Sequence, residues 1–307
     1  METPVIDVII PVYKPEKKYA ALLKMLEKQS VKVRRVYVIN TQKRYYNSGS
    51  YPYNGEIKVK HIEPDEFDHG RTRNDGIMAS NADYCLLMTQ DAVPADELLV
   101  EKLLECFSAD DVAVAYARQL PDEDCRIIER LARNFNYPEE SCIKYKKDID
   151  SMGIKAFFCS DVCAMYDRKK NKQQGGFIKK TIFNEDMIMA YKFLMAGYGV
   201  YYKADACVIH SHNYSNMQQF HRNFDLGVSQ ADNPEVFANI SSESEGARYI
   251  FKMTSLLIRN KAAYYIPYFY INSVFRLAGY KLGKAYRRLP ESFVMACTMN
   301  KNYWRQL

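Results

Sequence analysis

Short apolar runs rich in β-branched residues alternate with helical segments from the N-terminal region to about residue 210. Continuous runs of this kind are typical of strands that are buried on both faces of a parallel sheet. We expect strands at residues 5–11, 36–40, 57–62, 84–88, 112–116, 157–166 and 200–209. Residues 185–196 are predicted to form a helix that ends at Gly197. The alternation predicts an α/β fold of Rossmann type, with a mostly parallel, doubly wound central sheet flanked by helices.

The sequence changes character near residue 245, where it becomes helical, aromatic and basic. With 307 residues, the chain is long enough for one large domain, expected at residues 1–244, and a helical appendage at residues 245–307. From residue 246 onwards, 11 lysines and arginines stand against one acid, Glu291. So large a local excess of positive charge predicts contact with an anionic surface.

An uncharged, aromatic run of 14 residues, 262–275, lies within this basic tail and is too short to cross a bilayer. Tyrosine rings favour interfaces, so we expect the tail to lie in the plane of an anionic membrane surface. The alternative is a contact between copies of the chain in a homo-oligomer. Nucleic acid is not an expected partner, because no nucleic-acid-binding motif accompanies the charge. The first residues also lack the pattern of a secretory signal, which predicts a cytoplasmic protein on the inner face of the membrane.

Asp91 follows the apolar strand at residues 84–88 by three positions. Ligands of open α/β sheets bind at the carboxyl ends of the strands. A nucleotide diphosphate needs a divalent cation, and a carboxylate is a natural ligand of Mg²⁺ or Mn²⁺. The alternative is that Asp91 only begins a turn before Pro94.

Two other segments carry charge at helix starts. Arg71 and Arg73 open one expected helix, where they would either bind phosphate or form a solvated basic turn. Glu185 and Asp186 open the helix at residues 185–196, where they would either supply a general base or complement the helix dipole.

Two histidines, His210 and His212, follow the strand at residues 200–209. A histidine at the carboxyl end of a strand is a candidate metal ligand beside Asp91. The alternative is an ordinary polar loop.

Several long segments occur in one order along nearly the whole chain: VIIPVYKP, HGRTRN, TQDAVP, ARQLP, FNYP, GIKAFFCSD, GGF, NEDM, AGYGVYYKADACVIHSHNYS and KLGKAYRRLP. Together they resemble family-2 glycosyltransferases with the GT-A fold. More narrowly, they resemble bacterial rhamnosyltransferases that assemble cell-wall and O-antigen polysaccharides.

This resemblance implies a set of residues that bind the nucleotide sugar: Pro11, Val12, Tyr13, Thr41, Arg71, Arg73, Asn74, Gln90 and Asp91. Many family members have an aspartate near the position of Asn40, so recognition of the base stays open.

The resemblance also implies a metal site. The Asp-x-Asp motif of the family corresponds to Thr89-Gln90-Asp91, which retains one carboxylate. Asp91 and His210, in preference to His212, would hold Mg²⁺ or Mn²⁺.

For catalysis, the resemblance implies that Asp186 is the base of an inverting displacement, with Glu185 as the second candidate. Gly175, Gly176 and Phe177 would shape the acceptor side.

The expected activity is transfer of L-rhamnose from dTDP-L-rhamnose to a growing, lipid-linked polysaccharide. A galactofuranosyl- or hexosyltransferase that uses a UDP-sugar is the alternative within the enzyme class. A catalytically silent GT-A module that binds glycan or protein is the alternative outside it.

Overall fold

The computed structural model describes residues 4–238 and 243–305. Two compact units divide the chain. The first contains residues up to Leu120, Tyr137–Lys180 and Glu185–His210, and the second contains Pro121–Asn136, Thr181–Asn184 and Ser211–Leu307. The boundary expected after residue 244, between a catalytic domain and a helical tail, stays a prediction.

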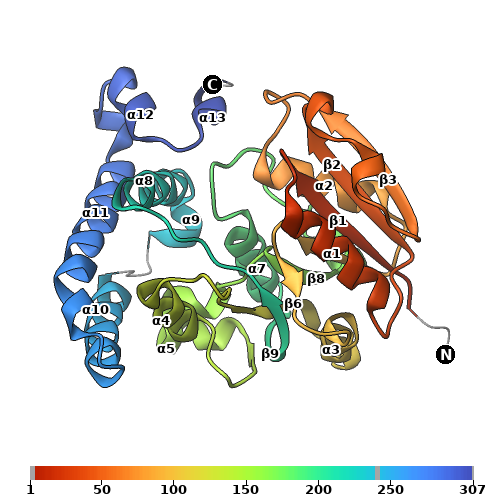
Figure 1. The fold of residues 1–307 in the computed structure, drawn as a ribbon, viewed down its shortest axis with the longest axis horizontal. Coiled ribbons are helices and arrows are strands. Elements are labelled where there is room, and N and C mark those ends of the chain that lie inside the picture. The colour runs from red at the N-terminus through yellow and green to blue at the C-terminus, as the bar shows by residue number, and fades with distance from the viewer. Residues whose placement is uncertain (1–3, 239–242, 306–307) are drawn as a thin grey trace. The chain divides into compact units, whose positions relative to one another are not determined.

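The first unit is built on one nine-stranded sheet, in which β3-β2-β1-β4-β8-β6-β9-β5 are neighbours and β7 also pairs with β9. Figure 1 shows β3, β2 and β1 side by side in this sheet. The strands are β1 (Ile6–Val12), β2 (Arg35–Thr41), β3 (Glu56–Ile62), β4 (Tyr84–Met88), β5 (Val93–Pro94), β6 (Val112–Leu120), β7 (Cys142–Lys144), β8 (Cys163–Asp167) and β9 (Gly199–Ile209). The helices of this unit are α1 (Lys17–Lys28), α2 (His69–Ala79), α3 (Leu99–Glu105), α5 (Ile149–Met152), α6 (Arg168–Gln173) and α7 (Glu185–Met195).

The predicted α/β sheet with flanking helices is confirmed, and its strands run in mixed directions. Strands β3, β2, β1 and β4 are parallel, as are β6 and β9. Strand β8 runs antiparallel to both of its neighbours, β4 and β6. The sheet is therefore parallel in its N-terminal half, where the carboxyl ends of β1, β2 and β4 form one edge.

Side chains of β1 alternate between two covered faces, which explains its continuous apolar sequence. Val8 and Ile10 belong to a core that also includes Leu22 of α1 and Leu103 of α3. Ile9 points the other way, toward α2, where a Cβ on Gly76 would lie 2.4 Å from an Ile9 methyl carbon. Helices thus cover both faces of this strand.

The strand expected at residues 157–166 is shorter than predicted and begins at Cys163. The backbone of Cys163 donates to the carbonyl of Ser160 in a turn, and Gly153–Phe157 forms a 3₁₀ helix. Asp161 is thereby placed in the connection before the strand rather than in the sheet.

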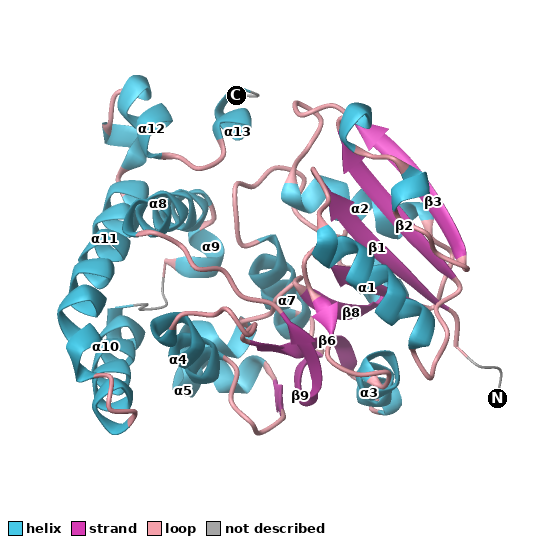
Figure 2. Ribbon diagram, viewed as in Figure 1, coloured by secondary structure: helices cyan, strands magenta, loops and turns pink. Residues whose placement is uncertain are grey.

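The second unit contains α4 (Ile127–Asn136), α8 (Asn216–Asp232), α9 (Pro234–Phe237), α10 (Glu243–Arg259), α11 (Ile266–Lys284), α12 (Glu291–Cys297) and α13 (Lys301–Arg305) (Figure 2). Helices α8 and α11 approach closely, because a Cβ on Gly283 would lie 2.0 Å from the carbonyl oxygen of Phe224. One apolar cluster joins α4, α10 and α11, and another joins α8 to α12 and α13. In the described part of the chain, no helix combines the length and apolar character needed to cross a bilayer.

Candidate active site

The carboxyl ends of β1, β2 and β4 bring together residues expected to bind the nucleotide. Val12 of β1 pairs in register with Asn40 of β2. Strand β1 also pairs with β4, so the residues that follow Met88, including Gln90, lie beside the end of β1. The side chain of Gln90 binds the backbone of Tyr13 twice: its Oε1 accepts the Tyr13 N–H at 2.8 Å, and its Nε2 donates to the Tyr13 carbonyl at 2.9 Å. This double contact fixes the loop after β1 to the loop after β4.

Asn40 at the end of β2 is fully buried, whereas the Tyr13 ring is 46% exposed. The Asn40 amide nitrogen binds the carbonyl of Gln42 at 3.0 Å and His61 Nδ1 at 3.1 Å. The Asn40 Oδ1 is buried without a hydrogen-bond partner. The loops therefore offer one exposed ring and one buried acceptor, and base recognition by Tyr13, Asn40 and Thr41 stays a prediction.

Asp91 and His210 lie together because β5 pairs with β9. Val93 is in register with Ile209, so the residues before Val93 and those after Ile209 meet at this end of the pairing. Asp91 lies two residues before Val93, and His210 directly follows Ile209. His210 Nε2 lies 3.5 Å from Asp91 Oδ2, with the histidine buried and the aspartate partly exposed. Backbone pairing of His210 N–H with the Leu120 carbonyl at 2.9 Å fixes the histidine at the end of β9.

This pair fits a divalent cation. Carboxylate oxygen and imidazole nitrogen both bind such ions at about 2.0–2.2 Å, which places two neighbouring ligand atoms roughly 3–3.5 Å apart. The measured 3.5 Å between the two ligand atoms is compatible with that geometry. His212 follows two residues later, in the part of the chain that belongs to the second unit.

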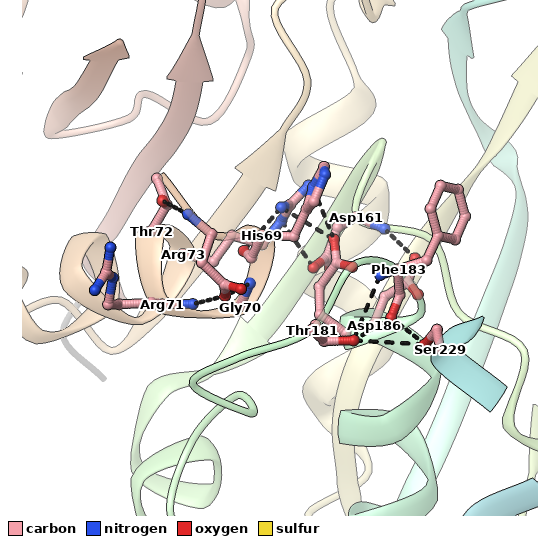
Figure 3. A network of polar contacts seen from close by, with 12 residues as sticks. His69, Gly70, Arg71, Thr72, Arg73, Asp161, Thr181, Phe183, Asp186 and Ser229 are labelled. Atoms are coloured by element: carbon pink, nitrogen blue, oxygen red, sulfur yellow. Dashed lines mark hydrogen bonds and ion pairs between the residues drawn. The ribbon is translucent and has the colours of Figure 1, made fainter. Parts of the chain in front are cut away.

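A buried ion-pair cluster lies at the start of α7. Arg73 Nη1 is 3.0 Å from Glu185 Oε1. Arg73 Nε is 3.0 Å from Asp161 Oδ2, and both of these residues are labelled in Figure 3. Tyr166 donates its hydroxyl to Asp161 Oδ1 at 2.7 Å. Burial disfavours the charged guanidinium, yet Glu185 and Asp161 hold the pKa of Arg73 above its usual value. Arg73 therefore neutralises two buried carboxylates.

Asp186 is more accessible than Glu185: it is partly exposed, whereas Glu185 is 6% exposed. Its Oδ2 accepts the backbone N–H of Asp161 at 3.2 Å, and its Oδ1 accepts the N–H of Met187 at 2.8 Å. Burial, and then the negative charges of Glu185 and Asp161, raise the pKa of Asp186 well above its usual value. Of the two acids, Asp186 has the accessibility and the raised basicity that a general base needs.

The backbone before α7 explains how these acids are presented. Asn184 has a φ of 63°, in the left-handed region that asparagine tolerates better than most residues. This turn immediately precedes Glu185, so both acids occupy the first turn of α7. Negative charge at this end is also favoured by the helix dipole.

Three further predicted residues, Arg71, Asn74 and Phe177, make other contacts. Arg71 is exposed and its guanidinium donates to the carbonyl of Glu66. Asn74 holds the backbone of Phe177 from both sides, at 2.8 Å and 3.0 Å. Phe177 is buried against the ring of Tyr166, with the centroids 5.3 Å apart. The phenyl ring therefore packs in the core, and the role of Phe177 on the acceptor side stays a prediction.

Gly175 and Gly176 line an open hollow of about 510 Å³ together with Arg71 and Asn74. Both glycines have positive φ, and a Cβ on Gly176 would lie 2.4 Å from Asn74 Oδ1. The expected nucleotide-binding residues Arg71 and Asn74 therefore share one hollow with the two glycines expected on the acceptor side.

Asp161 ends the segment GIKAFFCSD but is not among the residues predicted for the site. Its importance follows from its contacts with Arg73, Tyr166 and Asp186. The signal in the sequence is an aspartate at the end of a largely apolar segment. Such a residue is expected to be buried, and a buried charge needs partners.

Comparison with known proteins agrees with this architecture. Residues 7–175 match glycosyl transferase family 2. The mannosyltransferase PcManGT from Pyrobaculum calidifontis, solved in complex with GDP-Man and Mn²⁺, aligns over 99% of this chain and 86% of its own, with a TM-score of 0.55 and 13% identity. TarS 1–349 of S. aureus, in complex with UDP-GlcNAc, aligns over 92% of both chains, with a TM-score of 0.52 and 14% identity. At such low identity the likeness concerns the fold, and it confirms the expected GT-A architecture.

Two relatives are much closer in sequence. The O-antigen chain rhamnosyltransferase WbaN of Salmonella anatum is 40% identical over 248 residues, which cover 80% of this chain and 78% of that protein. The O-antigen chain rhamnosyltransferase RfbN of Salmonella typhimurium (strain LT2) is 34% identical over 307 residues, which cover 98% and 96%. With the family match spanning more than half of the sequence, this chain belongs to glycosyl transferase family 2.

Proposed function

We propose that this protein is an inverting glycosyltransferase that moves L-rhamnose from dTDP-L-rhamnose to a growing, lipid-linked polysaccharide. The observation that carries the proposal is the placement of Asp186, partly exposed and raised in pKa, beside the buried ion pairs of Arg73. The choice of sugar rests on the two relatives, both named O-antigen chain rhamnosyltransferases.

Asp186 would act as the base. Its carboxylate accepts the proton of the acceptor hydroxyl while that oxygen bonds to the anomeric carbon and the bond from carbon to the diphosphate oxygen breaks. Glu185 has a different part, because its carboxylate is engaged by Arg73 and is buried. Its negative charge keeps Asp186 basic. Asp161 holds Asp186 through its backbone N–H.

Asp91 and His210 would hold the divalent cation, Mg²⁺ or Mn²⁺. The ion, when bound, neutralises charge on the diphosphate leaving group. The pair in this protein supplies one carboxylate and one imidazole, and the donor's phosphate oxygens and water would complete the coordination.

The basic tail, residues 245–307, would attach the enzyme to the inner face of the cell membrane, where a lipid-linked acceptor is held. Its apolar side chains are exposed on the second unit, with Phe251 of α10 at 84% and Tyr264 before α11 at 75%. Val274 of α11 is 64% exposed. Cations flank these residues along both helices, which suits an anionic lipid surface.

Flotation with vesicles tests the membrane proposal. Wild-type protein should float with vesicles that contain anionic lipid and remain behind with neutral vesicles. Replacement of Phe251 and Val274 by serine should reduce flotation. Equal binding to neutral vesicles would contradict the electrostatic part, and a concentration-dependent dimer lost in the same variant would favour a homo-oligomer contact instead.

A donor panel tests the proposed activity. Release of nucleoside diphosphate is measured with dTDP-L-rhamnose, UDP-galactofuranose and UDP-hexoses, with acceptor present, before and after EDTA. We expect release from dTDP-L-rhamnose that is lost with EDTA and in Asp186→Asn. Preference for a UDP-sugar would instead support the galactofuranosyl- or hexosyltransferase alternative. Release from no donor would support a catalytically silent binding module.

A further inference from the structure

Three side chains from separate segments form a buried hydrogen-bond network in the first unit, and one of them, Gln119, contacts the imidazole of His210. Gln119 comes from β6, Tyr137 follows α4, and Ser160 lies in the turn before β8. With His210, all are at most 8% exposed. Gln119, Tyr137 and Ser160 belong to three of the segments that carry the family resemblance, ARQLP, FNYP and GIKAFFCSD, and none of them is among the predicted site residues.

Gln119 connects these side chains. Its Nε2 donates to the Tyr137 hydroxyl at 2.5 Å and to the Ser160 hydroxyl at 2.9 Å. An amide nitrogen has two hydrogens, so these contacts engage both of them. The Gln119 Oε1 then faces His210 Nδ1 at 2.9 Å. An amide oxygen only accepts hydrogen bonds, so in this arrangement His210 carries a proton on Nδ1.

The other imidazole nitrogen, Nε2, faces Asp91 at 3.5 Å. Metal-binding histidines generally donate their second ring N–H to an acceptor that fixes the tautomer and the ring orientation. Gln119 has the position and the acceptor atom for that part.

We propose that Gln119 is a positioning residue, oriented by Tyr137 and Ser160, that keeps the His210 proton on Nδ1 and directs Nε2 to the cation beside Asp91. The inference rests on the proposed function, because it requires the cation. It extends beyond the two metal ligands to the buried residues that set the tautomer and the ring orientation of His210.

The opposite orientation of the Gln119 amide would favour the other tautomer of His210. If the Gln119 side chain were rotated by 180°, its nitrogen would donate to His210 Nδ1 and the imidazole proton would move to Nε2. Hydroxyl groups donate as well as accept, so Tyr137 and Ser160 fit both orientations. Only the form with the proton on Nδ1 leaves Nε2 able to bind a metal, and the two forms are distinguishable by nitrogen NMR.

The first experiment measures the tautomer directly. Protein labelled with ¹⁵N in histidine is saturated with Mg²⁺ and dTDP, and the His210 ring signals are assigned by comparison with His210→Gln. We expect the ring proton on Nδ1. A proton on Nε2 would overturn the inference, whatever the activity of the enzyme.

The second experiment measures Mn²⁺ binding in the presence of dTDP by electron paramagnetic resonance, without turnover. Gln119→Leu removes the acceptor and should weaken Mn²⁺ binding by about 10–100-fold. Gln119→Glu keeps an acceptor oxygen toward His210 and should retain most of the affinity. Tyr202→Phe is the matched control, because it removes a buried hydroxyl that donates to the Pro138 carbonyl at 2.7 Å.

The outcomes separate the inference from the proposed function. If wild-type protein with dTDP bound no Mn²⁺, the metal site itself would be wrong. If wild type and Gln119→Leu bound Mn²⁺ equally well, the site would stand and the positioning role would be wrong. Equal weakening in Gln119→Leu and Gln119→Glu would also overturn it, since the acceptor oxygen that Gln119→Glu retains would then not be what supports Mn²⁺ binding.

Discussion

Arg73 Nη1 lies 3.0 Å from Glu185 Oε1, and both side chains are less than a tenth exposed. A second carboxylate, Asp161, is 3.0 Å from Arg73 Nε. Removal of one partner from a buried ion pair leaves charge that is neither paired nor hydrated, which typically costs about 3–5 kcal/mol. Arg73→Met should therefore lower the free energy of unfolding by about that amount, as measured by urea denaturation.

Arg71→Met is the matched control for this change. Arg71 lies on the same helix but is exposed, and exposed substitutions usually change stability by less than about 0.5 kcal/mol. Similar midpoints of unfolding for Arg73→Met and wild type would mean that the ion pairs of Arg73 do not stabilise the fold.

Asp186→Asn should abolish most turnover while donor binding persists. The amide keeps the size and the hydrogen bond from Asp161 N–H but cannot accept the acceptor proton. Loss of a general base typically costs about 10²–10⁴-fold in rate. Steady-state kcat, together with calorimetric titration of dTDP, checks this prediction. Near-normal kcat would instead point to Glu185 as the base.

The pH profile of kcat/KM tests the environment of Asp186. Burial and the charges of Glu185 and Asp161 raise the pKa of Asp186. The base must be ionised, so activity should fall as the pH is lowered through this raised pKa, above the range near 3.9 that is usual for aspartate. Glu185→Gln removes one negative charge and should move the acid limb of the profile to lower pH. An unchanged acid limb would show that the two carboxylates are not electrostatically coupled.

The sequence predicted the main strands well because their cores are local patterns: β1 and β4 are continuous apolar runs that only a doubly covered sheet can bury. It could not predict β5 or β7, whose two and three residues carry no periodicity and are ordered by pairing with β9. The pairing of β5 with β9 also determines the geometry of the site, because it places Asp91 beside His210.

The environment of Arg73 illustrates a second limit. Its position at a helix start predicts either a phosphate ligand or a solvated basic turn, and phosphate binding by Arg73 stays a prediction. Its protein partners, Asp161 and Glu185, are distant in the sequence. Whether a cation at a helix start meets phosphate or protein carboxylates depends on which loops fold against it. No local pattern in the sequence contains that information.

Asp91→Asn should raise the Mn²⁺ concentration needed for half-maximal activity by at least about 10-fold. A neutral amide is a weaker ligand for a hard cation than a carboxylate, and His210 alone would remain. EDTA should inactivate wild type, and added Mn²⁺ should restore it. Asp205→Asn is the control, because Asp205 is an exposed acid of β9 beside Lys203. An identical metal requirement for all three proteins would place the cation elsewhere.

Gly283→Ala should destabilise the second unit, where α8 and α11 approach closely. The added Cβ would lie 2.0 Å from the carbonyl oxygen of Phe224, so the helices must separate, and overpacking of this kind typically costs about 1–3 kcal/mol. Gly246→Ala in α10 is the matched control: its Cβ would meet no atom within 4 Å, and alanine favours the helix by about 0.5–1 kcal/mol. The two variants should therefore shift the midpoint of thermal unfolding in opposite directions. A shift of the same sign and size in both would show that the contact of Gly283 with Phe224 is not a constraint on this helix pair.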